Sequence, residues 1–293
     1  MRRRFGTRRV GHAGTLDPLA SGLLVVAVGP ATRFLQYLSL EPKEYLADVR
    51  FGHATSTYDA EGVPTESGPV PEDLPAALEG VLPAFRGLIQ QLPPMYSAVK
   101  LNGKPLYTYA RRGEEVERRP RTVHIDELTV MDERATDHKL PERATAQRAV
   151  HPDEAQGVGY ARLKIRCSGG TYVRTLAHDI GAALGCGAHL VGLVRTQVGR
   201  FYLTAAKKLE EVGPDDLIPL GEALAPMPPI QLDEASERHA RDGRMLAFEA
   251  AQVPDSPLAV LLDLKGGIVG VGRVTGHTVH PECVLPREAA PAV

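Results

Sequence analysis

The sequence has no tryptophan and little of what a disulfide framework, a zinc site or a membrane span requires. Its three cysteines, Cys167, Cys186 and Cys283, are odd in number and match no zinc-binding spacing. No apolar run reaches the roughly 18 residues that indicate a transmembrane helix, and no apolar signal-peptide core follows the basic first residues. We therefore expect reduced, partly buried cysteines and a cytoplasmic protein.

The chain also has no excess of positive charge, because 36 acidic residues balance 34 lysines and arginines and give a formal net charge of −2 at pH 7. This excludes a uniformly basic nucleic-acid binder, although local clusters matter more than the sum. Residues 1–9 carry arginines and no acid, and residues 97–122 are rich in lysine and arginine against three glutamates. For any single run, a solvated surface is the interpretation we prefer. An apolar share of 43% is ordinary for a globular protein, and 293 residues suffice for two domains.

Residues 11–29 are the most constrained stretch of the chain. Three glycines, Gly11, Gly14 and Gly22, permit tight backbone conformations in a loop that carries Asp17. Pro18 favours an extended conformation at Asp17, and the apolar run 23–28 predicts a buried strand directly after the loop. Asp-Pro in a loop is usually a turn former. The density of constraint around Asp17 favours a functional carboxylate instead.

This stretch resembles the first signature of the TruB family of bacterial tRNA pseudouridine synthases, Gly-His-(Thr/Ala)-Gly-x-Leu-Asp-Pro-x-Ala-x-Gly. Further stretches resemble later signatures of that family: residues 43–45, 52–62, 91–100, 168–175, 185–190 and 193–196. The resemblance implies that Asp17 is the covalent catalyst, that Arg174 pairs with it, and that Tyr45 stacks on the target base. Without the resemblance, Tyr45 would be interpreted as a packed tyrosine at a strand end, and Arg174 as a surface arginine in the first turn of a helix.

The resemblance also implies a set of substrate-binding residues. His12 would be a second stacking surface, Leu193 would line the uracil pocket, and Tyr172 would bind the substrate. The basic segment 97–122 corresponds to a flexible thumb that closes on RNA, in which arginine and lysine contact phosphates. Its expected RNA-binding side chains include Lys100, Arg111 and Arg112. In the stretch 52–62, Thr55, Thr57 and Asp59 could hydrogen-bond RNA, but turn stabilisation is the interpretation we prefer.

Hydrophobic patterning predicts the remaining elements. Helical spacing occurs over residues 31–38, over residues 73–85 and from Leu176 to Leu184. Alternation predicts strands over residues 45–51, 123–130 and 161–167, of which 123–130 is uneven. Two apolar runs, 258–264 and 268–274, are joined by Lys-Gly-Gly and predict a hairpin.

Domain organisation follows from composition and from the resemblance. Prolines between residues 214 and 229 indicate a boundary, so we expect a catalytic domain over residues 1–222 and a small domain over 229–293 that resembles the PUA RNA-binding domain. Residues 131–159 are polar without apolar periodicity and are interpreted as a surface insertion. Family members begin earlier, with a strand containing Lys-Pro-x-Gly, so either the start codon is mis-assigned or the catalytic sheet lacks that strand. Because a lost strand would expose a sheet edge, we expect a truncated gene model.

Together these features predict a mixed α/β (α+β) pseudouridine synthase domain with a C-terminal β-rich PUA-like domain. The implied activity is isomerisation of uridine 55 in the T-loop of tRNA to pseudouridine, with the base flipped out of the loop. Attack by Asp17 on carbon 6 of the uracil or on carbon 1′ of the ribose stays open at this stage. No cofactor or metal is required, and the expected protein is a monomer that binds tRNA and no membrane.

Two alternatives remain. One is the guide-RNA-dependent relative of the family, against which the continuous basic segment 103–121 argues. The other is an RNA-binding or RNA-folding protein that does not catalyse, which the absent N-terminal strand favours. The presence of Asp17, Tyr45 and Arg174 together argues against it.

Overall fold

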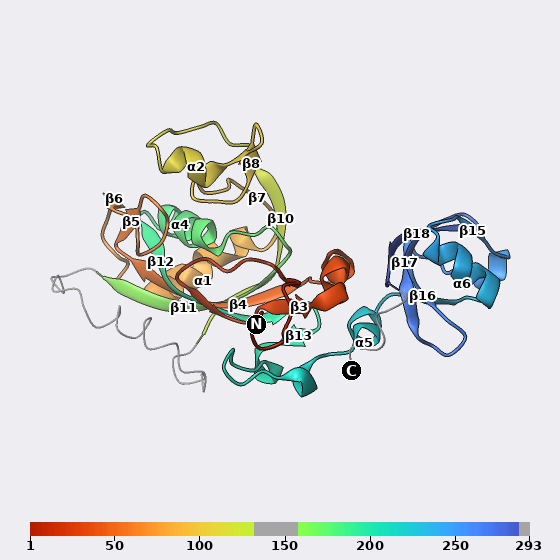
Figure 1. The fold of residues 1–293 in the computed structure, drawn as a ribbon. Coiled ribbons are helices and arrows are strands. Elements are labelled where there is room, and N and C mark those ends of the chain that lie inside the picture. The colour runs from red at the N-terminus through yellow and green to blue at the C-terminus, as the bar shows by residue number, and fades with distance from the viewer. Residues whose placement is uncertain (132–157, 287–293) are drawn as a thin grey trace. The chain divides into compact units, whose positions relative to one another are not determined.

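The computed structural model describes residues 1–131 and 158–286, and the chain divides into two compact units. One unit comprises residues 16–23 and 40–205, and the other comprises residues 1–15, 24–39 and those from 206 onward. Figure 1 shows the elements of both. Nearly all of the predicted insertion 131–159 lies outside the described residues. No helix in the described ranges is long and apolar enough to cross a membrane.

A seven-stranded sheet organises the first unit. Its order is β13-β12-β4-β11-β10-β7, and β2 pairs in parallel with β12. The predicted alternation is confirmed in β4, because Tyr45, Ala47, Val49 and Phe51 all face one hydrophobic core. The strands are β2 (Ala20–Gly22), β4 (Lys43–Phe51), β7 (Gly87–Gln91), β10 (Arg121–Val130), β11 (Gly159–Cys167), β12 (Ala188–Val198) and β13 (Phe201–Tyr202).

Helices α1 (Leu74–Val81) and α4 (Val173–Ala183) pack on the core face of this sheet (Figure 1). Asp73 caps α1 by accepting a hydrogen bond from the Ala76 amide at 3.0 Å. The predicted helix over residues 73–85 is present, but it continues after Val81 as the 3₁₀ helix η2 (Leu82–Phe85). Gly181 lets α4 lie against β12, because a Cβ there would be 2.2 Å from the Ala188 amide nitrogen.

The uneven pattern predicted for β10 has a structural cause. The register between β10 and β11 shifts between Ile125 and Glu127, which is a β-bulge. Ile125 faces the core before the bulge and Leu128 faces it afterwards, since the extra residue reverses the alternation.

The thumb segment lies between β7 and β10 in sequence and, in Figure 1, beyond the ends of these two strands. It contains the two-residue strands β8 (Lys100–Leu101) and β9 (Lys104–Pro105), followed by α2 (Leu106–Ala110). Only Leu106 of α2 is buried, so most of the segment's side chains are available to a ligand. A second short hairpin, β5 (His53–Thr55) with β6 (Pro64–Ser67), follows β4.

The prediction of a buried strand over residues 23–28 was wrong in its start and in its burial. The chain turns at Gly22, the last residue of β2, whose φ is +97°. A separate strand, β3 (Val25–Val28), is half-buried and pairs with β1 (Val10–Ala13) in the second unit. The predicted helix over residues 31–38 is a 3₁₀ helix, η1 (Gly29–Tyr37), and it buries Phe34.

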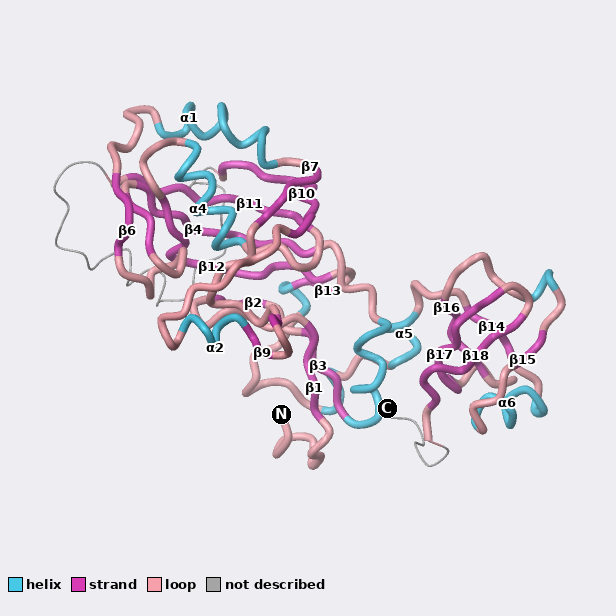
Figure 2. The backbone as a smooth tube through the Cα atoms, turned by 90° about the horizontal axis from the view of Figure 1, so that it is seen from above, coloured by secondary structure: helices cyan, strands magenta, loops and turns pink. Residues whose placement is uncertain are grey.

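The rest of the second unit is β-rich, as predicted. Its five-stranded sheet has the order β14-β16-β17-β18-β15, and Figure 2 shows helix α6 packed beside it. The predicted hairpin is confirmed by the antiparallel pairing of β16 with β17. The remaining elements are β14 (Pro229–Gln231), β15 (Leu246–Ala247), β16 (Leu258–Leu262), β17 (Ile268–Thr275), β18 (Thr278–Val284), α5 (Leu220–Leu224), α6 (Glu234–Arg241), and the 3₁₀ turns η4 (Leu203–Ala205), η5 (Pro214–Asp216) and η6 (Ala250–Gln252).

Candidate active site

The Asp17 loop enters the sheet of the first unit through β2. The Ala20 amide donates to the Asp17 carbonyl at 2.9 Å, which closes a turn around Pro18. The next residues pair in parallel with β12, with Ala20 opposite Leu193. The loop is thus fixed to the sheet within three residues of Asp17. The Asp17 side chain remains 37% exposed and can meet a substrate.

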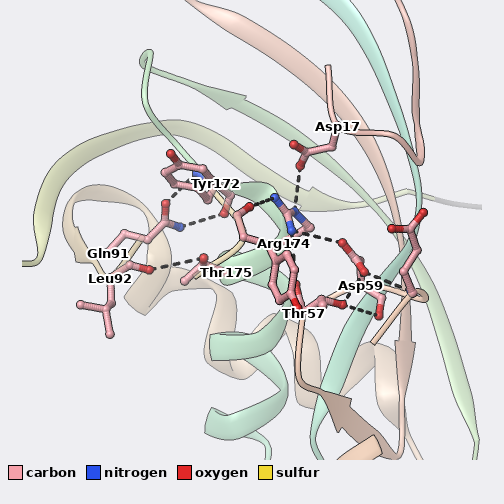
Figure 3. A network of polar contacts seen from close by, with 10 residues as sticks. Asp17, Thr57, Asp59, Gln91, Leu92, Tyr172, Arg174 and Thr175 are labelled. Atoms are coloured by element: carbon pink, nitrogen blue, oxygen red, sulfur yellow. Dashed lines mark hydrogen bonds and ion pairs between the residues drawn. The ribbon is translucent and has the colours of Figure 1, made fainter. Parts of the chain in front are cut away.

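Arg174 is the centre of the polar network at this site (Figure 3). Its side chain is 6% exposed, and its Nε donates to Oδ2 of Asp17 at 2.8 Å. Nη1 donates to Oδ2 of Asp59 at 3.2 Å, and Nη2 donates to the Tyr96 carbonyl at 3.0 Å. Figure 3 shows Asp17 on one side of the guanidinium and Asp59 on the other. One planar group therefore joins three separate loops.

Asp59 is held by its own loop. Its Oδ1 accepts a hydrogen bond from the Thr57 hydroxyl and another from the Glu61 amide at 3.1 Å. Tyr58 has the left-handed φ of +64° and stacks on His178, with ring centroids 4.0 Å apart. The preferred interpretation of this loop as a stabilised turn is therefore incomplete. One oxygen of Asp59 stabilises the turn, and the other pairs with Arg174.

The charges around Arg174 compensate one another. Arg174 is the second residue of α4, and a cation is unfavourable at the positive end of a helix dipole. A buried guanidinium without acceptors would also lose its hydration. Asp17 and Asp59 offset both costs, and Asp17, the more exposed of the two, is the one that a ligand can reach.

Gln91 ties the end of β7 to the start of α4. Its side-chain amide donates to the Tyr172 carbonyl at 3.0 Å, and its Oε1 accepts from the Tyr172 amide at 2.7 Å. Tyr172 is the N-cap residue of α4, so this reciprocal pair replaces a side-chain cap. It fixes the helix terminus that presents Arg174.

Tyr45 and Leu193 lie on neighbouring strands of the sheet and belong to one hydrophobic core. Burial raises the pKa of Tyr45 to about 12, against a hydrogen bond and a positive charge from Arg195 that lower the pKa. The Tyr45 hydroxyl therefore stays protonated at neutral pH. Within the described residues, no group of three or more His, Cys, Asp or Glu side chains is placed to hold a metal ion.

Two family models match most of the chain. Residues 2–173 match the model of the TruB family pseudouridylate synthase N-terminal domain, and residues 174–224 match that of the tRNA pseudouridylate synthase B C-terminal domain. The chain belongs to the TruB family. The tRNA pseudouridine synthase B of Cupriavidus metallidurans is 40% identical over 96% of this chain and 86% of its own length.

Two further relatives extend the comparison of this TruB family chain. The tRNA pseudouridine synthase B of Thermobifida fusca is 44% identical over 81% of this chain and 76% of its own length. Among solved structures, a chain of a Cbf5-Nop10-Gar1 complex superposes with a TM-score of 0.64 and 25% identity, covering 98% of this chain and 80% of that one. These matches confirm the pseudouridine synthase fold.

The structure places the other predicted site residues of this TruB family chain on separate elements. His12 is exposed on β1, which belongs to the other unit, so its stacking role stays a prediction. Lys100 lies on β8, and Arg111 and Arg112 follow α2, all in the thumb segment and exposed. Arg111 lies over the Tyr107 ring, 5.3 Å from its centroid, which holds its charge near an aromatic face.

The sequence analysis predicted no catalytic role for three residues of this TruB site, which are Asp59, Gln91 and Arg195. Each lies in a stretch that resembles a family signature, and this resemblance was the sequence feature that could have indicated a role at the site. Polarity at these positions does not distinguish a surface side chain from a buried, hydrogen-bonded one. That distinction depends on neighbours from distant parts of the chain.

Gly22→Ala is expected to lower the free energy of unfolding by at least about 2 kcal/mol. A Cβ at Gly22 would lie 2.4 Å from the Arg195 carbonyl oxygen, and the φ of +97° disfavours any side chain. Urea denaturation measures the loss. Gly80→Ala is the matched control, because nothing lies within 4 Å of its Cβ and the residue is helical. Equal effects of the two substitutions would contradict the close approach at Gly22.

Proposed function

We propose that this protein is a tRNA pseudouridine synthase that isomerises uridine 55 in the T-loop of tRNA. The observation that carries the proposal is the Asp17–Arg174 pair at 2.8 Å, at the end of a loop fixed to the sheet of a TruB family fold. The names of the relatives give the substrate class, since they are tRNA pseudouridine synthases. The reaction is an intramolecular transfer, which makes the enzyme an isomerase.

Asp17 is the nucleophile in the proposed mechanism. Its carboxylate attacks the uridine at carbon 6 of the base or carbon 1′ of the ribose, and the bond from nitrogen 1 to carbon 1′ breaks. The base turns, carbon 5 bonds to carbon 1′, and the bond between Asp17 and the substrate breaks, which returns the free carboxylate. Carbon 5 then loses its proton and nitrogen 1 gains one. No net oxidation or hydrolysis takes place. The protein residues therefore supply the nucleophile, hold the nucleophile and the base in position, and balance charge.

Other side chains orient the nucleophile and the base. Arg174 holds one oxygen of Asp17 in a fixed position, which restricts the direction of attack. The base must leave the T-loop stack to reach Asp17, and we assign Tyr45 and His12 to stack on it. Tyr172 and Leu193 are assigned to the wall of the uracil site. Burial of Tyr45 and Leu193 supports an apolar environment for the base.

Isotope release tests the function directly. A T-arm transcript tritiated at carbon 5 of uridine should release tritium to water when the protein is added. A transcript with cytidine at position 55 is the control, because it offers no uridine at the reacting position. Absence of release from the uridine transcript, with binding intact, would favour the alternative of a non-catalytic RNA-binding protein. The continuous thumb segment favours a stand-alone enzyme over the guide-RNA-dependent one.

The proposed organisation keeps a catalytic domain over residues 1–222 and a PUA-like domain over residues 229–293. The location of β14 to β18 between Pro229 and Val284 supports the second boundary. We propose a monomer, which light scattering of the protein alone and with tRNA tests. A tRNA substrate implies action in the cytoplasm.

Neutralising the exposed thumb arginines should weaken tRNA binding and flatten its salt dependence. Arg111, Arg112 and Arg119 are exposed, and each phosphate contact contributes about 0.9 to the slope of log K against log salt concentration. The triple glutamine variant should therefore lose up to about 3 from that slope. Filter binding at several salt concentrations measures it.

Arg118 provides the internal control for the thumb variant. Its side chain is 12% exposed, and its Nη1 donates to the Pro93 carbonyl at 3.1 Å. Arg118→Gln should therefore change stability more than the salt slope. A slope that is unchanged in the triple variant would show that the three exposed charges are merely solvated.

A further inference from the structure

Among the residues that the structure describes, Arg195 is the largest fully buried side chain that the proposed mechanism does not use. It lies on β12 and is 1% exposed. Burial of a guanidinium is costly unless its donors are satisfied with good geometry. A methionine or leucine would fill the same space without that cost. The contacts of Arg195 therefore indicate what the charge is for.

The first contact of Arg195 is with the end of the Asp17 loop. Its Nε donates to the Leu23 carbonyl at 2.8 Å, and its own carbonyl accepts from the Leu23 amide at 2.8 Å. Gly22 lies directly opposite Arg195 in the parallel pairing of β2 with β12. The residue thus holds both polar groups of Leu23, six positions after Asp17, where the loop leaves the sheet.

The second contact of Arg195 is with Tyr45. The two residues are opposite one another in the antiparallel pairing of β12 with β4. Arg195 gives the Tyr45 side chain a hydrogen bond and a positive charge, which lower the pKa of Tyr45 against the stronger effect of burial. A β-bulge directly after Arg195, between Arg195 and Gln197, changes the local direction of the strand.

We propose that Arg195 is a positioning residue that connects the Asp17 loop to the Tyr45 ring through one guanidinium. The two elements come from different parts of the chain, and β12 lies between them in the sheet. A displacement of about 1 Å between the attacking carboxylate and the base would cost about 100-fold in rate. The inference rests on the proposed function, and it adds a residue that acts through the Asp17 loop and through Tyr45.

Arg195→Lys is the test, because lysine keeps the charge but has no planar fork to reach both partners. We expect the single-turnover rate at saturating enzyme to fall about 10- to 100-fold, with tRNA Kd within about threefold. Arg162→Lys is the matched control. Arg162 is an arginine of the same sheet paired with Asp48 at 2.7 Å, and its replacement should leave the rate within about twofold.

A spectroscopic measurement that does not depend on activity distinguishes a positioning role of Arg195 from a purely structural one. Tyrosines are labelled with 3-fluorotyrosine, and the Tyr45 fluorine resonance is identified by its loss in Tyr45→Phe. This resonance should shift and broaden in Arg195→Lys and stay unchanged in Arg162→Lys. A normal rate, or an unmoved Tyr45 resonance, in a folded Arg195→Lys would overturn the proposal. A parent protein that forms no pseudouridine would sink the proposed function instead, and the resonance comparison would still decide the role of Arg195.

A second measurement applies if Arg195→Lys does not fold. Hydrogen exchange of the Leu23 amide is compared between the parent and Tyr45→Phe. If Arg195 joins the two elements, removal of the Tyr45 hydroxyl should accelerate exchange at Leu23 at least about threefold. Unchanged exchange would show that Arg195 holds the loop without reference to Tyr45, and the proposal would fail.

Discussion

Asp17→Asn is expected to abolish pseudouridine formation and to leave tRNA binding nearly unchanged. An amide has almost the shape of the carboxylate but is no nucleophile. We expect the single-turnover rate to fall by a factor of about 10,000 or more, with Kd for tRNA within a few-fold. Tritium release from carbon 5 measures the rate, and filter binding measures Kd.

Asp48→Asn is the matched control for Asp17→Asn. Asp48 also accepts a short hydrogen bond from an arginine, since Nε of Arg162 lies 2.7 Å from its Oδ1. It lies on β4 and takes no part in the network around Arg174. Its amide variant should keep the rate within about twofold. Turnover by purified Asp17→Asn that exceeds the uncatalysed background would remove Asp17 from the nucleophile role.

The local hydrophobic pattern correctly predicted those helices and strands in which the spacing of apolar side chains stays the same from the first residue to the last. The alternation of β4 is regular because every second residue faces the same core. The hydrophobic pattern of β10 was uneven because a bulge after Ile125 reverses which residues face the core. The residue types in this strand do not predict a bulge. The run 23–28 looked like one buried strand because an apolar pattern does not show that pairing begins only at Val25 or that residues 25–28 stay half-exposed.

The contacts of the site could not be derived from spacing. Asp17 and Arg174 are 157 positions apart, and only the resemblance to a family suggested their pairing. Asp59 looked like a turn residue because its loop is rich in threonine and glycine, and the turn is real. Its second role depends on the start of α4 lying beside that loop. Such a contact follows from tertiary packing, which no local pattern contains.

Arg195 illustrates the same limit in a strand. An arginine between Val194 and Thr196 is consistent with an exposed face of a sheet, yet it is 1% exposed. Its guanidinium bonds the residue that follows β2, and β2 pairs in parallel with β12 after a stretch that contains Gly11 and Gly14. Parallel pairing between such short, distant segments has no signal in the hydrophobic pattern.

Replacement of Arg174 is expected to have the largest combined effect on rate and stability. Arg174→Met removes the partner of Asp59, whose side chain is 6% exposed, and leaves a buried carboxylate without its cation. Breaking a buried pair in this way costs about 3–5 kcal/mol of unfolding free energy. The rate should fall at least about 100-fold, because Asp17 loses the group that orients it.

A second substitution separates the two effects of Arg174. In Arg174→Met/Asp59→Asn the buried charge is removed, while the amide oxygen can still accept from the Glu61 amide as Oδ1 of Asp59 does. We expect the double variant to recover more than half of the lost unfolding free energy. Its rate should stay as low as that of Arg174→Met. Urea denaturation and single-turnover rates at saturating enzyme measure the two quantities separately.

Arg162→Met provides the comparison for an ion pair outside the site. The Arg162 and Asp48 side chains are 15% and 20% exposed, so water compensates part of the loss, and the rate should stay within about twofold. Arg174→Lys completes the series. Lysine keeps the charge near Asp17 and Asp59 but cannot donate to both carboxylates and the Tyr96 carbonyl at once, so stability should recover further than rate. If rate and stability recover together in the double variant, Arg174 supports the fold alone and its role in orienting Asp17 is excluded.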